Sequence, residues 1–186
     1  MTDVRLATQQ WIDSVVVGLE LCPFAAPVVA QGRLRIVSTD AEAPAELAAA
    51  LDAELAHLLR VPVEEVETTL LVHPRALLAF EEYNDFLDVA DALLVERGCE
   101  GVVQIASFHP EYRFADAAPD DAANWTNRAP FPMLHLLREA SVEEAIANFG
   151  DTSEVPERNT ARLRALGVDG MRARLAACLD SDATSD

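Results

Sequence analysis

The chain has 186 residues, of which 51% are hydrophobic and 25% charged, and this composition is typical of a globular domain with a buried core. Its formal net charge of -18 at pH 7 repels phosphate backbones and anionic lipid headgroups, so we expect no nucleic-acid or membrane partner. All 14 basic residues are arginine, which excludes Schiff-base and P-loop chemistry because both need a lysine.

Asp13 and Glu20 interrupt the only apolar run near the N-terminus, so we predict no signal peptide. No stretch approaches the ~20 apolar residues of a membrane span. The three cysteines are odd in number and far apart, which is typical of free thiols in a reducing compartment. We therefore expect a cytoplasmic protein with a single domain over residues 1–186 and a disordered tail at 180–186.

Hydrophobic spacing predicts alternating helices and strands through residue 108. In chain order these are a helix over 4–21, a strand over 33–39, a helix that begins near residue 40, a strand over 67–72, a helix from 80 to 98, and a strand over 102–108. Single-helix connections favour parallel strands with right-handed crossovers. We predict an α/β fold with a small, three-stranded, mostly parallel sheet, and a ferredoxin-like α+β sandwich is the alternative.

The segment from Glu111 to Phe131 follows neither period and is dominated by Pro, Asp, Asn and Ala. A loop of about twenty residues in a compact domain is usually functional or disordered. Its aromatic residues argue against disorder, so we expect an ordered loop packed over the sheet edge. Further helices are predicted over 132–139, 142–149, 154–166 and 169–179.

Two predicted strands end in His-Pro, at His73 and at His109. In open parallel sheets ligands gather at the carboxyl ends of strands, so both imidazoles would lie at one rim if the strands are neighbours. His109 is the candidate general acid or base, because imidazole titrates near neutral pH and the polar loop begins there. For His73 we expect a strand end bonded to the backbone.

The segment NWTNRAPFPMLHLLRE, over 124–139, carries a second set of candidates. Arg128 offers a planar fork that suits carboxylate or phosphate. On the predicted helix, His135 and Arg138 share a face, and Glu139 lies close to them. A purely structural role, with a turn, a helix start and a surface Arg-Glu pair, is the alternative.

Cys22 ends the first predicted helix, where the helix dipole does not stabilise a thiolate, so we expect a buried structural cysteine. A metal site built from His109, His135, Cys22 and His73 is chemically reasonable, although the ligand spacing matches no known motif. The sequence leaves the cofactor unknown: it has no GxGxxG, Walker, HExxH, GxSxG, CxxC or EF-hand motif, which argues against the common nucleotide, zinc and serine-hydrolase sites.

Five segments together resemble the bacterial domain-of-unknown-function 1415 family. They are LCPF at 21–24, ETTLLVHP at 67–74, QIASFHPEYRF at 104–114, NWTNRAPFPMLHLLRE at 124–139 and PERN at 156–159. The resemblance implies a stand-alone cytoplasmic domain but no particular activity, cofactor or partner. By motif match it selects Cys22, Gln104, His109, Tyr112, Asn124, Thr126, Asn127, Arg128, His135, Arg138, Glu139 and Asn159.

Two positions depart from the pattern that we associate with this family. An aromatic or apolar residue is associated with the position of His73, which weakens His73 as a ligand. Serine is associated with the position of Ala129, so a hydroxyl there is not essential in this chain.

The sequence favours a small enzyme that acts on an anionic small molecule. The catalytic candidates are His109, Arg128, His135 and Arg138, and the substrate-binding candidates are Gln104, Tyr112, Asn124, Thr126, Asn127 and Glu139. His109 would act as acid or base while Arg128 and Arg138 bind the anion. The alternatives are a non-catalytic metabolite- or metal-binding module and a scaffold or interaction protein.

Overall fold

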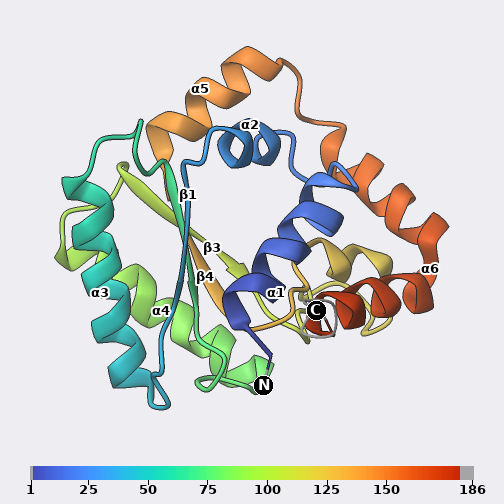
Figure 1. The fold of residues 1–186 in the computed structure, drawn as a ribbon, viewed down its shortest axis with the longest axis horizontal. Coiled ribbons are helices and arrows are strands. Elements are labelled where there is room, and N and C mark those ends of the chain that lie inside the picture. The colour runs from blue at the N-terminus through green and yellow to red at the C-terminus, as the bar shows by residue number, and fades with distance from the viewer. Residues whose placement is uncertain (1, 181–186) are drawn as a thin grey trace, which may run out of the picture.

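A sheet of four strands, in the order β1-β2-β4-β3, separates two groups of helices (Figure 1). The computed structural model describes residues 2–180, so residues 181–186 of the predicted tail lie outside the described residues. The strands are β1 Leu34–Ser38, β2 Thr68–Val72, β3 Val103–Phe108 and β4 Met133–Arg138. β1 and β2 are parallel, and β4 is antiparallel to both β2 and β3.

Helices cover both faces of the sheet. They are α1 Val4–Trp11, the π-helix η1 Ile12–Val17, α2 Ala25–Ala30, α3 Pro44–Arg60, α4 Phe80–Glu96, the 3-10 helix η2 Ala122–Thr126, α5 Glu139–Phe149 and α6 Val155–Leu179. α3 and α4 lie on one side of the sheet, and α1, η1 and α6 on the other (Figure 1). This three-layer arrangement differs from the ferredoxin-like alternative, in which helices cover one face only.

Alternation along the strands explains why both faces are buried. Leu71 of β2 joins the core under α3 and α4, whereas Leu70 and Val72 join the core under α1 and α6. On α3, Leu47, Leu51, Leu55 and Leu58 recur at helical spacing and are almost completely buried. The sheet is thus sandwiched between two apolar cores.

The prediction of a three-stranded, mostly parallel sheet is wrong, because the segment predicted as a helix over 132–139 forms the central strand β4. Its apolar run after Pro132 fits a buried helix or a strand covered on both faces equally well. Pairing with β2 on one side and β3 on the other decides in favour of the strand. The strand in turn makes most of the sheet antiparallel.

Two further differences concern helices. The N-terminal helix stops being an α-helix at Trp11 and continues as the π-helix η1, and the short helix α2 was not predicted. Gly18 follows η1, and a Cβ at this position would lie 2.6 Å from the Ser14 carbonyl oxygen. Glycine therefore permits the close approach of this turn. The predicted break near 167 is confirmed, since Gly167 has a φ of 72° inside α6.

Over the part of the chain that the structure describes, no helix combines the length and the apolar character required to cross a membrane.

Candidate functional site

His73 and His109 lie at the same edge of the sheet, as the sequence predicts, although β4 separates their strands. The ring of Tyr83, on α4, lies between them, with centroid distances of 5.8 Å to His73 and 5.1 Å to His109. The Tyr83 hydroxyl donates to the Met133 carbonyl at 2.8 Å and accepts from the Phe108 N–H at 3.0 Å. Three rings thus fill the space between α4 and the strand ends.

Both ring nitrogens of His109 are bonded to backbone groups. Nδ1 accepts from the Glu111 N–H at 3.0 Å, and Nε2 lies 3.2 Å from the Leu77 carbonyl oxygen, to which it must donate. The side chain is fully buried, and burial lowers its pKa, so the ring is neutral at pH 7. A role as acid or base would require the ring to release one of these bonds, and it stays a prediction.

His73 is held in a similar way. Its Nδ1–H donates to the Ala76 carbonyl at 3.0 Å, and its Nε2 has no hydrogen-bond partner among the described residues. Burial lowers the pKa of His73 to about 4, so this ring is also neutral. The two imidazoles therefore hold consecutive carbonyls, of Ala76 and Leu77, in a turn where Leu77 has a positive φ of 53°.

Arg128 holds the long loop. Its Nε donates to the Tyr112 carbonyl at 3.1 Å and its Nη2 to the Pro119 carbonyl at 2.9 Å. The guanidinium carbon lies 4.7 Å from the centroid of the Trp125 ring. The Tyr112 ring itself packs edge-on against Phe80, with centroids 5.3 Å apart. In this arrangement two of the three guanidinium nitrogens bind the protein backbone.

Arg138 lies at the opposite end of β4. It donates to the carbonyl oxygens of Leu58 at 2.6 Å, Val61 at 2.8 Å and Val66 at 3.2 Å. At ~3.4 Å per strand residue, its Cα is roughly 17 Å from that of Met133. Met133 begins β4 at the end of the sheet where His73 and His109 lie. Arg138 is thus too far from that edge to share a small ligand with His109.

His135 faces the α1 and α6 side of the sheet. Its ring lies 6.1 Å from that of Phe108, and its Nε2 is 2.6 Å from the Thr68 hydroxyl oxygen. That hydroxyl donates to the Leu136 carbonyl at 2.7 Å, so the imidazole must be the donor to Thr68. Burial lowers the pKa of His135 to about 4. Because 133–138 is a strand, His135 and Arg138 point to opposite faces, and the helix face predicted for them does not form.

Gln104 and Glu139 lie near Arg138. Gln104 is exposed on β3 and is paired with Leu137, and the Glu139 N–H donates to the Val102 carbonyl at 2.9 Å as α5 begins. The structure therefore places these two substrate-binding candidates away from His109 and Arg128.

The polar residues of the loop bind one another and the sheet. Asn127 Nδ2 donates to the Ser107 carbonyl at 3.0 Å, and the Asn127 carbonyl accepts from the His109 N–H at 3.1 Å. Asn124, which is fully buried, donates to the Ala118 carbonyl at 2.7 Å. The loop packs over the edge of the sheet as predicted, and these side chains fix its path.

A cavity of about 490 Å³ lies on the face of the sheet opposite to His109. Residues from η1, the turn after it, the end of β3, the long loop and α6 line it. They are Val16, Leu21, Cys22, Phe108, Phe114, Ala123, Thr126, Asn127, Val155, Pro156, Asn159 and Thr160. None of them carries a charge, and burial raises the pKa of the Cys22 thiol, so Cys22 is protonated at pH 7.

Asn159 is the most deeply buried polar residue of this lining, with 6% of its surface exposed. Its Nδ2 donates to the Leu21 carbonyl at 2.6 Å. Its Oδ1 has no hydrogen-bond partner in the described part of the chain. Most buried polar side-chain atoms are hydrogen-bonded, so this buried acceptor of a lining residue is a candidate position for a ligand's donor.

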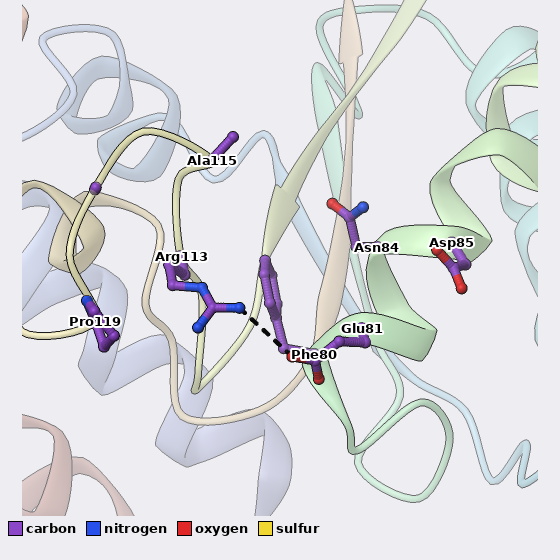
Figure 2. A pocket seen from close by; sticks show the side chains of 8 residues that line it. Phe80, Glu81, Asn84, Asp85, Arg113, Ala115 and Pro119 are labelled. Atoms are coloured by element: carbon purple, nitrogen blue, oxygen red, sulfur yellow. Dashed lines mark ion pairs between the residues drawn. The ribbon is translucent and has the colours of Figure 1, made fainter.

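A second depression, of about 480 Å³, lies between the long loop and α4. Figure 2 shows Arg113 reaching from the loop toward Glu81 at the start of α4, with which it forms an ion pair at 3.6 Å. Its lining comprises Phe80, Glu81, Asn84, Asp85, Arg113, Ala115, Ala117 and Pro119. Most of these side chains are exposed, and none is a candidate from the sequence.

Within residues 2–180, no three or more His, Cys, Asp or Glu side chains are placed to hold a metal ion. His109 contacts α4, whereas His135 faces α1 and α6 across the sheet. The metal site considered from the sequence does not form in this arrangement.

A family model described as "Protein of unknown function (DUF1415)" matches residues 3–173. The chain belongs to this family. No curated protein and no solved structure matches the chain. Four of the five sequence segments that resemble DUF1415 contribute to the lining of the Cys22 cavity, through Cys22, Phe108, Asn127 and Asn159 among others.

The sequence selects some of the residues that line this cavity and misses others. Cys22, Thr126, Asn127 and Asn159 were singled out, but their meeting place could not be derived. Phe108 and Phe114 also line the cavity, but they are not among the candidates that the sequence selects. Aromatic residues on either side of a polar loop were the one signal that could have indicated an apolar cavity.

Proposed function

We propose that this domain binds a small organic molecule in the cavity lined by Cys22 and Asn159. This is the non-catalytic binding module considered from the sequence, with its site moved to the opposite face of the sheet. The cavity carries the proposal, because about 490 Å³ of mostly apolar space with a few polar groups is typical of small-molecule sites. The unpaired Asn159 Oδ1 supports it further.

The chemistry of the lining favours binding over catalysis. A protonated, buried thiol is a weak nucleophile, and Cys22 is the only nucleophilic thiol in the wall. The lining contains no histidine, carboxylate or arginine that could act as acid, base or anion ligand. An enzyme that uses His109 and Arg128 is the competing proposal. It requires both side chains to break their hydrogen bonds to backbone carbonyls before they can bind a substrate.

Thermal denaturation in the presence of a library of small metabolites, combined with alkylation of Cys22, tests the proposal. A compound that binds in the cavity raises the Tm and slows the reaction of Cys22 with N-ethylmaleimide, measured by peptide mass spectrometry. The buried Cys99 and Cys178, which do not line the cavity, are internal controls.

Two substitutions locate the binding site. Ala123→Phe places a ring in the cavity and should abolish both effects, whereas Ala115→Phe in the depression beside α4 should leave them unchanged. Compounds that raise the Tm without protecting Cys22, and equally well in Ala123→Phe, would contradict the proposal.

A further inference from the structure

We infer that the ligand of the Cys22 cavity is an uncharged, largely apolar molecule that donates a hydrogen bond to Asn159 Oδ1. This inference rests on the binding function proposed above. It replaces the anionic ligand expected from the sequence, and the charges and hydrogen bonds around the cavity carry it.

No cation is available inside the cavity to balance an anion. Two arginines of α6 bind the turn after η1: Arg158 donates to the Glu20 carbonyl at 3.2 Å, and Arg162 donates to the Leu19 carbonyl and to the Glu20 carboxylate. Arg128 binds two carbonyls of the long loop. The lining thus offers an anion no charged partner, and the net charge of -18 further repels anions.

The two hydroxyls of the lining present acceptors. The Thr160 hydroxyl donates to the Pro156 carbonyl at 2.9 Å, and the Thr126 hydroxyl donates to the Ala123 carbonyl at 2.8 Å. Their hydrogens are therefore used within the protein, so these two hydroxyls can offer a ligand only oxygen lone pairs. A ligand that hydrogen-bonds to either hydroxyl must therefore bring the donor.

The orientation of the Asn159 amide is fixed by its neighbour. The Leu21 carbonyl can only accept, so the amide group 2.6 Å from it must be the NH₂ group. The Oδ1 is consequently the unpaired atom, and α6 holds its position. The ligand donor belongs at this oxygen, which is itself buried, so the lining must shift on binding for the donor to reach it.

A matched set of three fluorescent probes tests the inference. N-phenylnaphthylamine is neutral and apolar with one N–H donor, its N-methyl derivative lacks the donor, and anilinonaphthalene sulfonate adds an anionic group. We expect N-phenylnaphthylamine to bind the wild-type protein roughly five- to tenfold more tightly than the N-methyl derivative, as one hydrogen bond predicts. The sulfonate should bind more weakly than either.

Asn159→Leu separates the hydrogen bond from the steric effect of the methyl group. The preference for the N–H probe should disappear in Asn159→Leu and persist in Asn84→Leu, which makes the same change in the depression beside α4. Unfolding curves of both variants establish that each is folded.

Two results would overturn the inference alone: a preference for the N–H probe that survives in Asn159→Leu, or sulfonate binding as tight as that of the neutral probe. Equal binding of the N–H and N-methyl probes would also overturn it, because a water molecule would then be the donor to Asn159. If none of the three probes binds the folded protein, the binding function itself fails together with the inference.

Discussion

His73 and His109 donate hydrogen bonds to consecutive backbone carbonyls, those of Ala76 and Leu77. The two imidazoles come from different strands, and they fix the turn that leads into α4. Leu77 has a φ of 53°, which is rare for a residue with a branched side chain, so the turn is held in a strained conformation. This relationship assigns the two His-Pro motifs a structural role in the observed conformation.

Replacing His109 tests that role. In His109→Ala the Leu77 carbonyl and the Glu111 N–H lose their partners in a buried environment. We expect the free energy of unfolding to fall by about 2–4 kcal/mol, measured by urea denaturation. His57→Gln, on α3 outside this cluster, is the control. A change below about 0.5 kcal/mol in His109→Ala would show that the turn does not depend on His109.

Stability should decrease in mild acid, because His73 and His135 have pKa values near 4 in the folded protein against 6.5 for an ordinary histidine. Between these values the unfolded chain binds more protons than the folded chain, so the free energy of unfolding falls as the pH is lowered from 6.5 to about 4. Above pH 6.5 these two histidines leave stability independent of pH.

His73→Phe isolates one of the two contributions. The ring can still stack on Tyr83, but it no longer titrates. The slope of unfolding free energy against pH should decrease by up to about 1.4 kcal/mol per pH unit within this window, measured by urea denaturation across the range. An unchanged slope would mean that His73 is protonated in the folded protein at the same pH as in the unfolded chain.

Arg138 should stabilise the fold without contributing to ligand binding in the cavity. Arg138→Met leaves the carbonyls of Leu58, Val61 and Val66 without their shared donor, so we expect a loss of about 2–3 kcal/mol in unfolding free energy. Affinity for N-phenylnaphthylamine should stay within twofold of the wild type, because Arg138 is not part of the lining. Reduced affinity in a fully folded variant would contradict this separation.

The π-helix forms one wall of the cavity through Val16, and Gly18 permits its last turn. In Gly18→Ala the new Cβ would lie 2.6 Å from the Ser14 carbonyl oxygen, so the turn must shift. We expect weaker binding of N-phenylnaphthylamine and a stability loss of about 1–3 kcal/mol. At Gly170 a Cβ would lie 3.8 Å from Leu166, so Gly170→Ala should leave binding unchanged. Equal effects of the two substitutions would refute a special role for Gly18.

Local patterns predicted most helices and the three strands that follow a clear period. The prediction for β4 is wrong, because a short apolar run is compatible with either a helix or a strand. Only its pairing partners, residues 68–72 and 103–108, show that it is a strand, and they are distant in the sequence. The error carried over to the site: a helix would place His135 beside Arg138, whereas the strand turns them to opposite faces. The cavity could not be predicted, because it brings together Cys22, Phe108 and Asn159 from distant parts of the chain.

The central claim is that the cavity around Cys22 and Asn159 binds a small molecule. The most direct test is a titration of the wild-type protein with N-phenylnaphthylamine in which the alkylation rate of Cys22 is measured at each concentration. We predict saturable binding at one site, with protection of Cys22 rising in proportion to the occupied fraction. Binding that saturates while Cys22 reacts at its original rate, or no binding at all, would contradict the claim.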